Sequence, residues 1–275
     1  MSTLDRLRKM DRRYIYLILL IAIVWPLFAP IGFPLQVTPL VRQAYQFVES
    51  LPAGSVVAWS VDAGVAVLGE QFPQAKITFE HLIKRKNLKI IIVHFWEQGP
   101  LFMPSLMPKI EASGMKYGVD WVDLGYIPGG EAAMAAFADD IHRTVPTDVR
   151  GNKLSSLPLM QNVKTAKDIK LWITTSAGTP GVPEYARQVQ SRYGTPIIAG
   201  VLSQFATIYM PYINSKQLVG LLGGLRAAAE YEKLMGASGG ATRAMDALSN
   251  AHIVVITFVI MANVLYFSGK KNKRS

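Results

Sequence analysis

The chain contains no cysteine and only four histidines among its 275 residues. Without cysteine there is no disulfide framework, no thiolate nucleophile and no sulfur ligand for a metal ion. The histidines form neither the HExxH motif nor another spacing typical of metal ligands, and they are His81, His94, His142 and His252. We therefore expect no metal ion and assign no metal ligand.

Glycine motifs that bind phosphate groups are also absent. The sequence has neither a GxGxxG fingerprint nor a Walker loop, so we predict no cofactor. His94 and Glu97 are the one pair compatible with acid–base chemistry, and an enzyme would use them together with Asp62. A hydrogen-bonded structural histidine is the more common situation at such a position, and we assign no catalytic residue.

Charged residues are few, at 17% of the chain, and the net charge of +10 is concentrated at its two ends. Residues 1–13 carry +3 and residues 269–275 carry +4, which leaves only +3 for the rest. A nucleic-acid-binding protein needs a basic face on its folded domain. We therefore expect no nucleic-acid partner.

Long apolar runs near both ends are the strongest pattern in the sequence. Tyr14 to Leu35 contain no charged or amide side chain, and a second run extends from Ile253 to Phe267. A helix of about 20 apolar residues crosses the ~30 Å hydrocarbon layer of a bilayer. We predict transmembrane helices at 14–36 and 251–268.

The basic residues beside these runs predict the orientation of the protein. Lys and Arg that flank a membrane segment stay on the cytoplasmic side, and here they are concentrated in the two tails. We expect a two-pass protein of the cell membrane with both termini cytoplasmic and the central region extracytoplasmic. The first segment is expected to be a retained signal anchor, because Pro30 follows Phe28 and Ala29 where cleavage would need an accommodating residue.

Asn263 lies in the middle of the second apolar run. An amide that faces lipid is unsatisfied and favours a hydrogen bond to another helix. That helix is either the first transmembrane segment of the same chain or a helix of another subunit. The sequence leaves both alternatives open.

The region 55–235 alternates short apolar runs with segments of helical periodicity. The predicted strands are Ser55–Val61, Lys89–Phe95, Val119–Leu124, Ile169–Thr175 and Thr195–Val201. The predicted helices cover 65–85, 103–115, 130–143, 182–193 and 215–235. Strands that are apolar on both faces and alternate with helices predict a three-layer, doubly wound α/β fold around a mainly parallel five-stranded sheet. A linker or helix is expected at 37–54 and a linker at 236–250.

This pattern resembles flavodoxin-like or Rossmann-like domains, and one lobe of periplasmic ligand-binding proteins, over about 55–235. The resemblance is one of fold and implies the strand order 2-1-3-4-5. In that order the direction of winding reverses between strands 1 and 3, and ligands bind at the carboxyl ends of the strands beside this point.

Loops at the carboxyl ends of the predicted strands supply the candidate ligand-binding residues. Glycines there allow a close approach of backbone and ligand, and free amides at a helix start bind anionic groups. The candidates are Asp62, Gly64, Gly129, Gly130, Ser176, Gly178 and Thr179. The alternative is that these residues only turn each strand into the next helix, as every βα unit requires.

Two further segments have an unusual composition. The predicted helix 215–235 is rich in glycine and alanine, although each glycine costs a helix ~1 kcal/mol relative to alanine, so it should be closely packed against the sheet or another subunit. The candidate interface residues are Gly220, Gly223, Gly224, Ala227 and Asn263. The insertion at 145–168 has weak periodicity and is expected to be functional or a contact surface.

These observations favour a structural or accessory subunit of a membrane complex, with other membrane-protein subunits or further copies of the chain as partners. The alternative is an extracytoplasmic module that binds or senses a small molecule where the strand order reverses. An enzyme that acts on envelope components is the least supported function.

Overall fold

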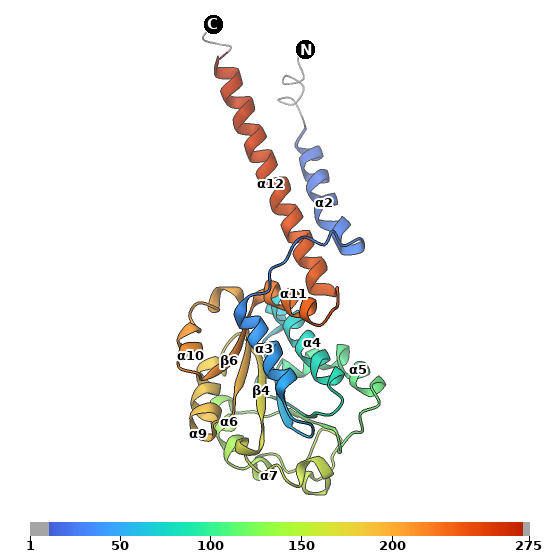
Figure 1. The fold of residues 1–275 in the computed structure, drawn as a ribbon, viewed down its shortest axis with the longest axis vertical. Coiled ribbons are helices and arrows are strands. Elements are labelled where there is room, and N and C mark those ends of the chain that lie inside the picture. Colours follow the sequence, from blue (N-terminus) through green and yellow to red (C-terminus); the bar gives the residue numbers. More distant parts are fainter. Residues whose placement is uncertain (1–10, 272–275) are drawn as a thin grey trace. The chain divides into compact units, whose positions relative to one another are not determined.

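The computed structural model describes residues 11–271 and divides the chain into two compact units (Figure 1). The first unit is Gln36–Ala237, and the second joins the two ends of the chain. The basic residues at 1–10 and 272–275, on which much of the orientation prediction depends, lie outside the described residues.

The first unit contains a six-stranded sheet in which all neighbouring strands are parallel. The order across the sheet is β3-β2-β1-β4-β5-β6. The strands are β1 (Val56–Asp62), β2 (Lys89–His94), β3 (Trp121–Tyr126), β4 (Leu171–Ser176), β5 (Ile197–Val201) and β6 (Leu218–Gly223). Because they all run in one direction, their carboxyl ends meet at the same edge.

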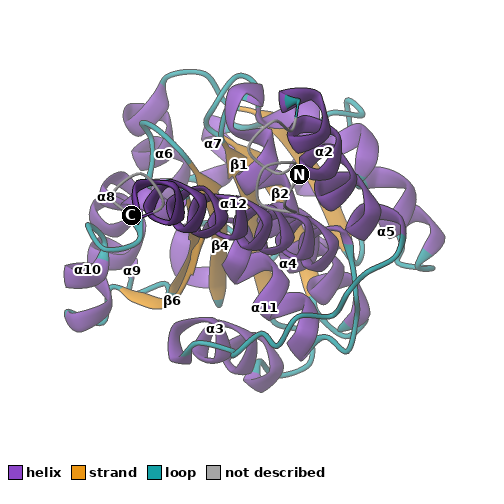
Figure 2. Cartoon of the chain, turned by 90° about the horizontal axis from the view of Figure 1, so that it is seen from above, coloured by secondary structure: helices purple, strands orange, loops and turns teal. Residues whose placement is uncertain are grey.

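Helices cover both faces of this sheet, as Figure 2 shows. One layer contains α3 (Pro39–Ser50), α4 (Leu68–Lys84) and α11 (Gly224–Leu234). The other contains α6 (Gly130–Asp139) and α8 (Val182–Tyr185), which continues into a π-helical turn, Ala186–Gln190. Shorter helices in the connections are α5 (Met107–Ala112), α7 (Ile141–Thr144), α9 (Ser191–Tyr193) and α10 (Met210–Asn214).

β1 shows why the strands are apolar throughout. The Trp59 indole N–H donates to Thr78 Oγ1 of α4 (3.2 Å), whereas the next residue, Ser60, hydrogen bonds to Tyr185 of α8 (2.8 Å). Consecutive side chains therefore enter opposite helical layers, and both Trp59 and Ser60 are fully buried. A strand covered on both faces needs no polar alternation. The predicted three-layer α/β fold is confirmed.

The prediction of five strands is wrong, because β6 occupies part of the segment predicted as helix 215–235 and α11 begins only at Gly224. Gly220 of β6 faces α3, where an added Cβ would lie 2.5 Å from the Ala44 Cβ. Glycine in a strand marks such a close backbone approach. Gly220 therefore reflects the packing of a helix on a strand.

The predicted strand order 2-1-3-4-5 is also wrong, because β3 lies at the edge of the sheet and the chain returns past β2 and β1 to reach β4. The insertion 145–168 lies beside this edge. The Val149 N–H donates to the Asp123 carbonyl (3.1 Å), and the Leu159 N–H donates to the Gly118 carbonyl (2.9 Å). The insertion thus protects backbone groups that an open sheet edge would expose.

The second unit pairs α2 (Arg12–Phe28) with α12 (Gly240–Lys271), and the two helices run antiparallel (Figure 1). The least exposed side chains of α2 are Ile15, Leu19, Ala22 and Pro26. Those of the apolar part of α12 include Ala247, Ala251, Val254, Phe258, Met261 and Leu265. Spacings of three and four residues on both helices are typical of a coiled-coil seam.

Asp246 of α12 fastens the loop that follows α2. Its carboxylate, which is 3% exposed, accepts the backbone N–H groups of Ile31 (2.9 Å), Gly32 (2.9 Å) and Phe33 (3.2 Å). Gly32 has φ +73°, a left-handed conformation that helps to direct successive amides toward one anion. The loop is therefore held to α12 by a charge-assisted cluster of hydrogen bonds.

Asn250 of α12 compensates for a missing backbone hydrogen bond inside α2. Pro26 has no N–H group to donate to the carbonyl of Ala22, four residues earlier. The Asn250 Nδ2 donates to this carbonyl across the helix pair at 2.8 Å. Ala22 and Pro26 are both buried, so the neighbouring helix satisfies an acceptor that would otherwise be costly in an apolar environment.

In the described part of the chain, α12 is the one helix long and apolar enough to cross a membrane, over Gly240–Ser268. It also takes up most of the connecting segment expected at 236–250. The spanning helix predicted at 14–36 is not matched, because α2 has 17 residues and ends at Phe28. Prolines follow closely, and proline cannot extend the hydrogen-bond pattern of a helix.

The Asn250–Ala22 bond predicts a specific coupling with Pro26. Asn250→Leu should destabilise the α2–α12 pair by about 1 kcal/mol, because the Ala22 carbonyl loses this donor. In a Pro26→Ala background the restored residue-26 N–H bonds to that carbonyl, and the cost of Asn250→Leu should fall below about half of that value. A double-mutant cycle on unfolding by SDS in mixed micelles measures both. An equal cost in the two backgrounds contradicts the assignment.

Candidate functional site

The observed strand order places the reversal of winding between β1 and β4. Asp62, the last residue of β1, is the register partner of Ser176, the last residue of β4. The loops that follow carry Gly64 and Gly178. These four candidates are brought together, and we call them the switch-point site.

The Asp62 carboxylate is fully buried and accepts hydrogen bonds at both oxygens. Its Oδ1 accepts the backbone N–H groups of Phe95 (2.6 Å) and Trp96 (3.1 Å). Its Oδ2 accepts the hydroxyls of Tyr185 (2.5 Å) and Thr174 (3.4 Å). One side chain therefore joins β1 to the residues after β2, to β4 and to α8. A ligand of this carboxylate would have to replace a donor that the protein already supplies.

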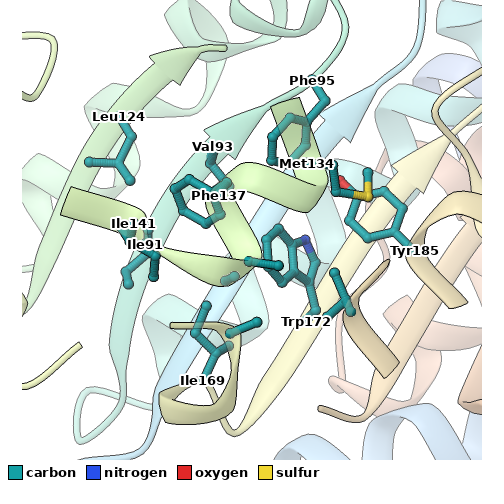
Figure 3. Packing of buried hydrophobic residues seen from close by; sticks show 14 of the residues in the cluster. Ile91, Val93, Phe95, Leu124, Met134, Phe137, Ile141, Ile169, Trp172 and Tyr185 are labelled. Atoms are coloured by element: carbon teal, nitrogen blue, oxygen red, sulfur yellow. The ribbon is translucent and has the colours of Figure 1, made fainter. Parts of the chain in front are cut away.

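Tyr185 extends this network into the apolar core. Its hydroxyl lies 2.8 Å from Ser60 Oγ, which also accepts the Trp172 indole N–H at 3.4 Å. Figure 3 shows the Tyr185 and Trp172 rings close together within the buried cluster, and their centroids are 5.4 Å apart. Sequence reasoning missed Tyr185, because only the fold brings α8 back to the end of β1.

Trp96 and Gln98 lie close to the two glycines of the switch-point site. A Cβ added to Gly178 would lie 3.0 Å from the Trp96 ring, and one added to Gly64 would lie 2.9 Å from Gln98 Oε1 and 3.8 Å from the Trp96 Nε1. The indole therefore lies between the loops that follow β1 and β4. Close approach of the protein's own side chains accounts for both glycines without a ligand.

The structure does not bring Gly129 and Gly130 to the switch-point site. They follow β3, two strands away from β1, with φ +117° and +57°. These left-handed conformations turn the strand into α6, whose Glu131 binds Arg187 through two hydrogen bonds of 3.0 Å. Thr179 lies in the loop after β4 and is exposed.

Burial shifts the pKa values of two side chains near this site in opposite directions, because it disfavours the charged form of each. Burial raises the pKa of Asp62 to about 6, and hydrogen bonds from Tyr185 and Phe95 oppose the rise. Burial lowers the pKa of His94 to about 4, and a hydrogen bond to the Val61 backbone opposes the fall.

The geometry gives no support for acid–base chemistry by His94 and Glu97. His94 is fully buried, and its Nδ1 lies 3.1 Å from both the nitrogen and the carbonyl oxygen of Val61. Its Nε2 has no hydrogen-bond partner within residues 11–271, whereas Glu97 is exposed. A buried imidazole held neutral by its surroundings cannot exchange protons readily with a substrate.

A pocket of about 330 Å³ opens beside the switch-point site and is lined by Ala66, Val67, Gly69, Glu70, Leu202 and Gln204. Glu70 Oε2 accepts the backbone N–H (2.9 Å) and the hydroxyl (2.6 Å) of Ser203. Gln71, next to Glu70 in α4, is fully buried, and its amide atoms have no hydrogen-bond partner in the described part of the chain. This pocket was not predicted, because it combines loops after β1 and β5.

A second pocket, of about 270 Å³, lies between the start of α3 and the start of α11. Glu230, at 1% exposure, accepts the Thr38 backbone N–H (2.8 Å) and hydroxyl (2.7 Å), and it binds Arg226 at 2.9 Å. A carboxylate at the first turn of α3 stabilises the helix. The candidate interface residues Gly223 and Ala227 line this pocket.

The remaining candidate interface residues contact their own chain. Gly220 faces Ala44, as described above. Gly224 has φ +67°, and a Cβ there would lie 2.0 Å from Ser203 Oγ. Asn263 is exposed, and its Nδ2 donates to the Val259 carbonyl of the same helix at 2.8 Å. The bond to the first helix that one alternative assigned to Asn263 is made by Asn250 instead.

Comparison with known proteins found no matching family model, no similar curated protein and no similar solved structure. Residues 11–271 also contain no cluster of three acidic or histidine side chains that could hold a metal ion. The function must therefore be inferred from the geometry.

The opposed pKa shifts predict opposite pH responses in two variants. Between pH 4 and 6 the folded chain keeps the Asp62 proton that the unfolded chain has lost, so this residue lowers stability as pH rises. His94 does the reverse, because the unfolded chain binds a proton that the folded chain excludes. Relative to wild type, Asp62→Asn should gain roughly 2 kcal/mol of stability over this interval and His94→Gln should lose roughly as much.

Chemical unfolding of the full chain in detergent at pH 4, 5 and 6 provides the measurement. Only the change with pH is compared, because each substitution also alters stability at every pH. Parallel curves for wild type and Asp62→Asn would show that Asp62 titrates normally in the folded protein.

Proposed function

We propose that the protein is a two-pass, membrane-anchored accessory subunit that presents an extracytoplasmic α/β domain to a membrane complex. The observation that carries this proposal is the closed switch-point site. Asp62, Tyr185 and Trp96 occupy the place where a parallel sheet of this order usually binds a ligand. The domain is therefore better suited to presenting a surface than to holding a substrate.

The helix pair supports membrane anchoring. Apart from the seam between them, α2 and α12 expose large apolar side chains, among them Leu20, Trp25, Ile256 and Ile260, at 58%, 63%, 57% and 59%. Exposed apolar area on this scale marks contact with a membrane or another protein. In the seam of the antiparallel pair, Asn250 donates to the Ala22 carbonyl, which Pro26 leaves without its helical donor. This bond supports insertion of α2 together with α12.

Orientation follows from the charges at the ends of the chain. The basic tails favour the cytoplasmic side for both termini. The domain between the helices is then extracytoplasmic. The 17 residues of α2 are near the lower limit for a spanning helix, and a bilayer accommodates a short apolar segment by local thinning.

The pocket at Glu70 favours a second candidate function, the binding of a small polar molecule. Its position at the carboxyl edge of the sheet is suitable for a ligand. The carboxylate of Glu70, which lines the pocket, suits a ligand with hydroxyl or amino groups and disfavours an anion. A sensing role would need a partner to pass on the signal.

Single-cysteine labelling tests the two-pass orientation, because the natural chain contains no cysteine. In intact cells, a membrane-impermeant maleimide should label Lys167→Cys in the domain and leave Thr3→Cys and Ser275→Cys unlabelled until the membrane is permeabilised. If α12 alone crosses the membrane, Thr3→Cys and Lys167→Cys should be labelled together. That result would overturn the two-pass proposal.

Native mass spectrometry of the full chain, extracted gently from its own membrane, tests the accessory role. We expect a stoichiometric assembly that contains other membrane proteins. Recovery without other proteins, but with a small molecule of defined mass whose retention is lost in Glu70→Gln, would favour the binding function instead. Glu111→Gln, the same change at an exposed carboxylate outside the pocket, serves as the control for handling losses.

A further inference from the structure

Asn263 is a polar side chain on a part of α12 that faces away from its own partner helix. It is exposed, and within residues 11–271 its side chain makes one hydrogen bond, to the Val259 carbonyl at 2.8 Å. That bond uses one N–H of the amide. The amide oxygen and the second N–H remain available to a group outside the chain.

The face around Asn263 is distinct from the seam with α2. Ile260 and Phe267 lie three and four residues from Asn263, and Ile256 lies seven residues from it, all on the same side of the helix. They are 57%, 59% and 63% exposed. The seam residues Val254, Phe258, Met261 and Leu265 project from the opposite side, since they are offset by about half a helical turn.

We propose that this face of α12 binds α12 of a second copy of the chain, with the two Asn263 amides hydrogen bonded to each other. The proposal rests on the membrane anchoring proposed above and names one partner in the assembly. An amide carries a donor and an acceptor, so two of them are mutually complementary. Two copies inserted in the same orientation place Asn263 at the same depth, and a two-fold axis along the membrane normal brings the pair together.

Lipid does not meet this requirement, because acyl chains offer no hydrogen-bond partner to the amide. A different protein would need its own polar residue at the matching depth. The second copy supplies that residue by symmetry, together with an apolar flank of Ile256, Ile260 and Phe267 suited to helix packing.

Cysteine cross-linking in native membranes tests the proposal, and the cysteine-free chain provides a clean background. Ile256→Cys and Ile260→Cys lie on the proposed face. Val255→Cys and Ala262→Cys lie seven residues apart on a neighbouring face of the helix, and both positions are apolar and exposed. Mild oxidation should give disulfide-linked dimers at 256 and 260 with at least about five-fold higher yield than at 255 and 262.

Substitution of Asn263 tests the role of the amide. In the Ile260→Cys background, Asn263→Leu should reduce the dimer yield about five-fold, the size of one hydrogen bond between membrane helices. Asn263→Gln, which keeps the amide, should retain most of the yield. Thr257→Val is the matched control, since it removes an exposed hydroxyl that bonds within α12 to the Ile253 carbonyl.

Equal dimer yields at all four cysteine positions would overturn the proposal and leave the face to lipid. Cross-links at 256 and 260 only to a chain of different mass would overturn it in favour of another protein. The outcome is independent of the native mass spectrometry, because the copies can pair whether or not other subunits are present. It is also separate from the labelling of Thr3→Cys, which reports on topology alone.

Discussion

The α/β domain depends on one buried carboxylate. Moving Asp62 out of water costs several kcal/mol, and the protein offsets this cost with four donors that come from the backbone after β2, from β4 and from α8. The same bonds position Trp96, so the interaction that organises the domain also closes its switch point.

The closed switch point distinguishes this domain from the usual ligand-binding form of the fold. An open α/β sheet offers a crevice where winding reverses, and here the crevice lies between β1 and β4. Gly64 and Gly178 resemble ligand-binding glycines in sequence, yet both accommodate side chains of the β2–α5 connection. The accessory role proposed above rests on this closure of the switch point. The pocket at Glu70 lies beside the point where the winding reverses and is a separate feature.

The layers of the domain were predictable, because strands that are buried on both faces are apolar along most of their length. The run that ends at Asp62 is one example. The strand order was not, because it depends on where the long connection after β3 returns, and nothing local to that segment specifies its destination. β6 was missed because Gly220 lowers strand and helix propensity alike. Glycine is needed there for close contact with Ala44, which is distant in the sequence. Tyr185 was missed for the same reason.

Two asparagines on α12 show how a polar residue in an apolar helix can be interpreted. Asn250 satisfies a backbone group of its own chain, since Pro26 leaves the Ala22 carbonyl without its helical donor. Asn263 compensates for no comparable defect. The residues of α2 that lie in the seam contain no second proline that would leave another carbonyl without its donor. An amide that costs free energy in lipid and corrects no internal defect is best explained by an interaction outside the chain. The distinction depends on pairing each polar residue with a specific unsatisfied backbone group, and hydropathy alone does not reveal it.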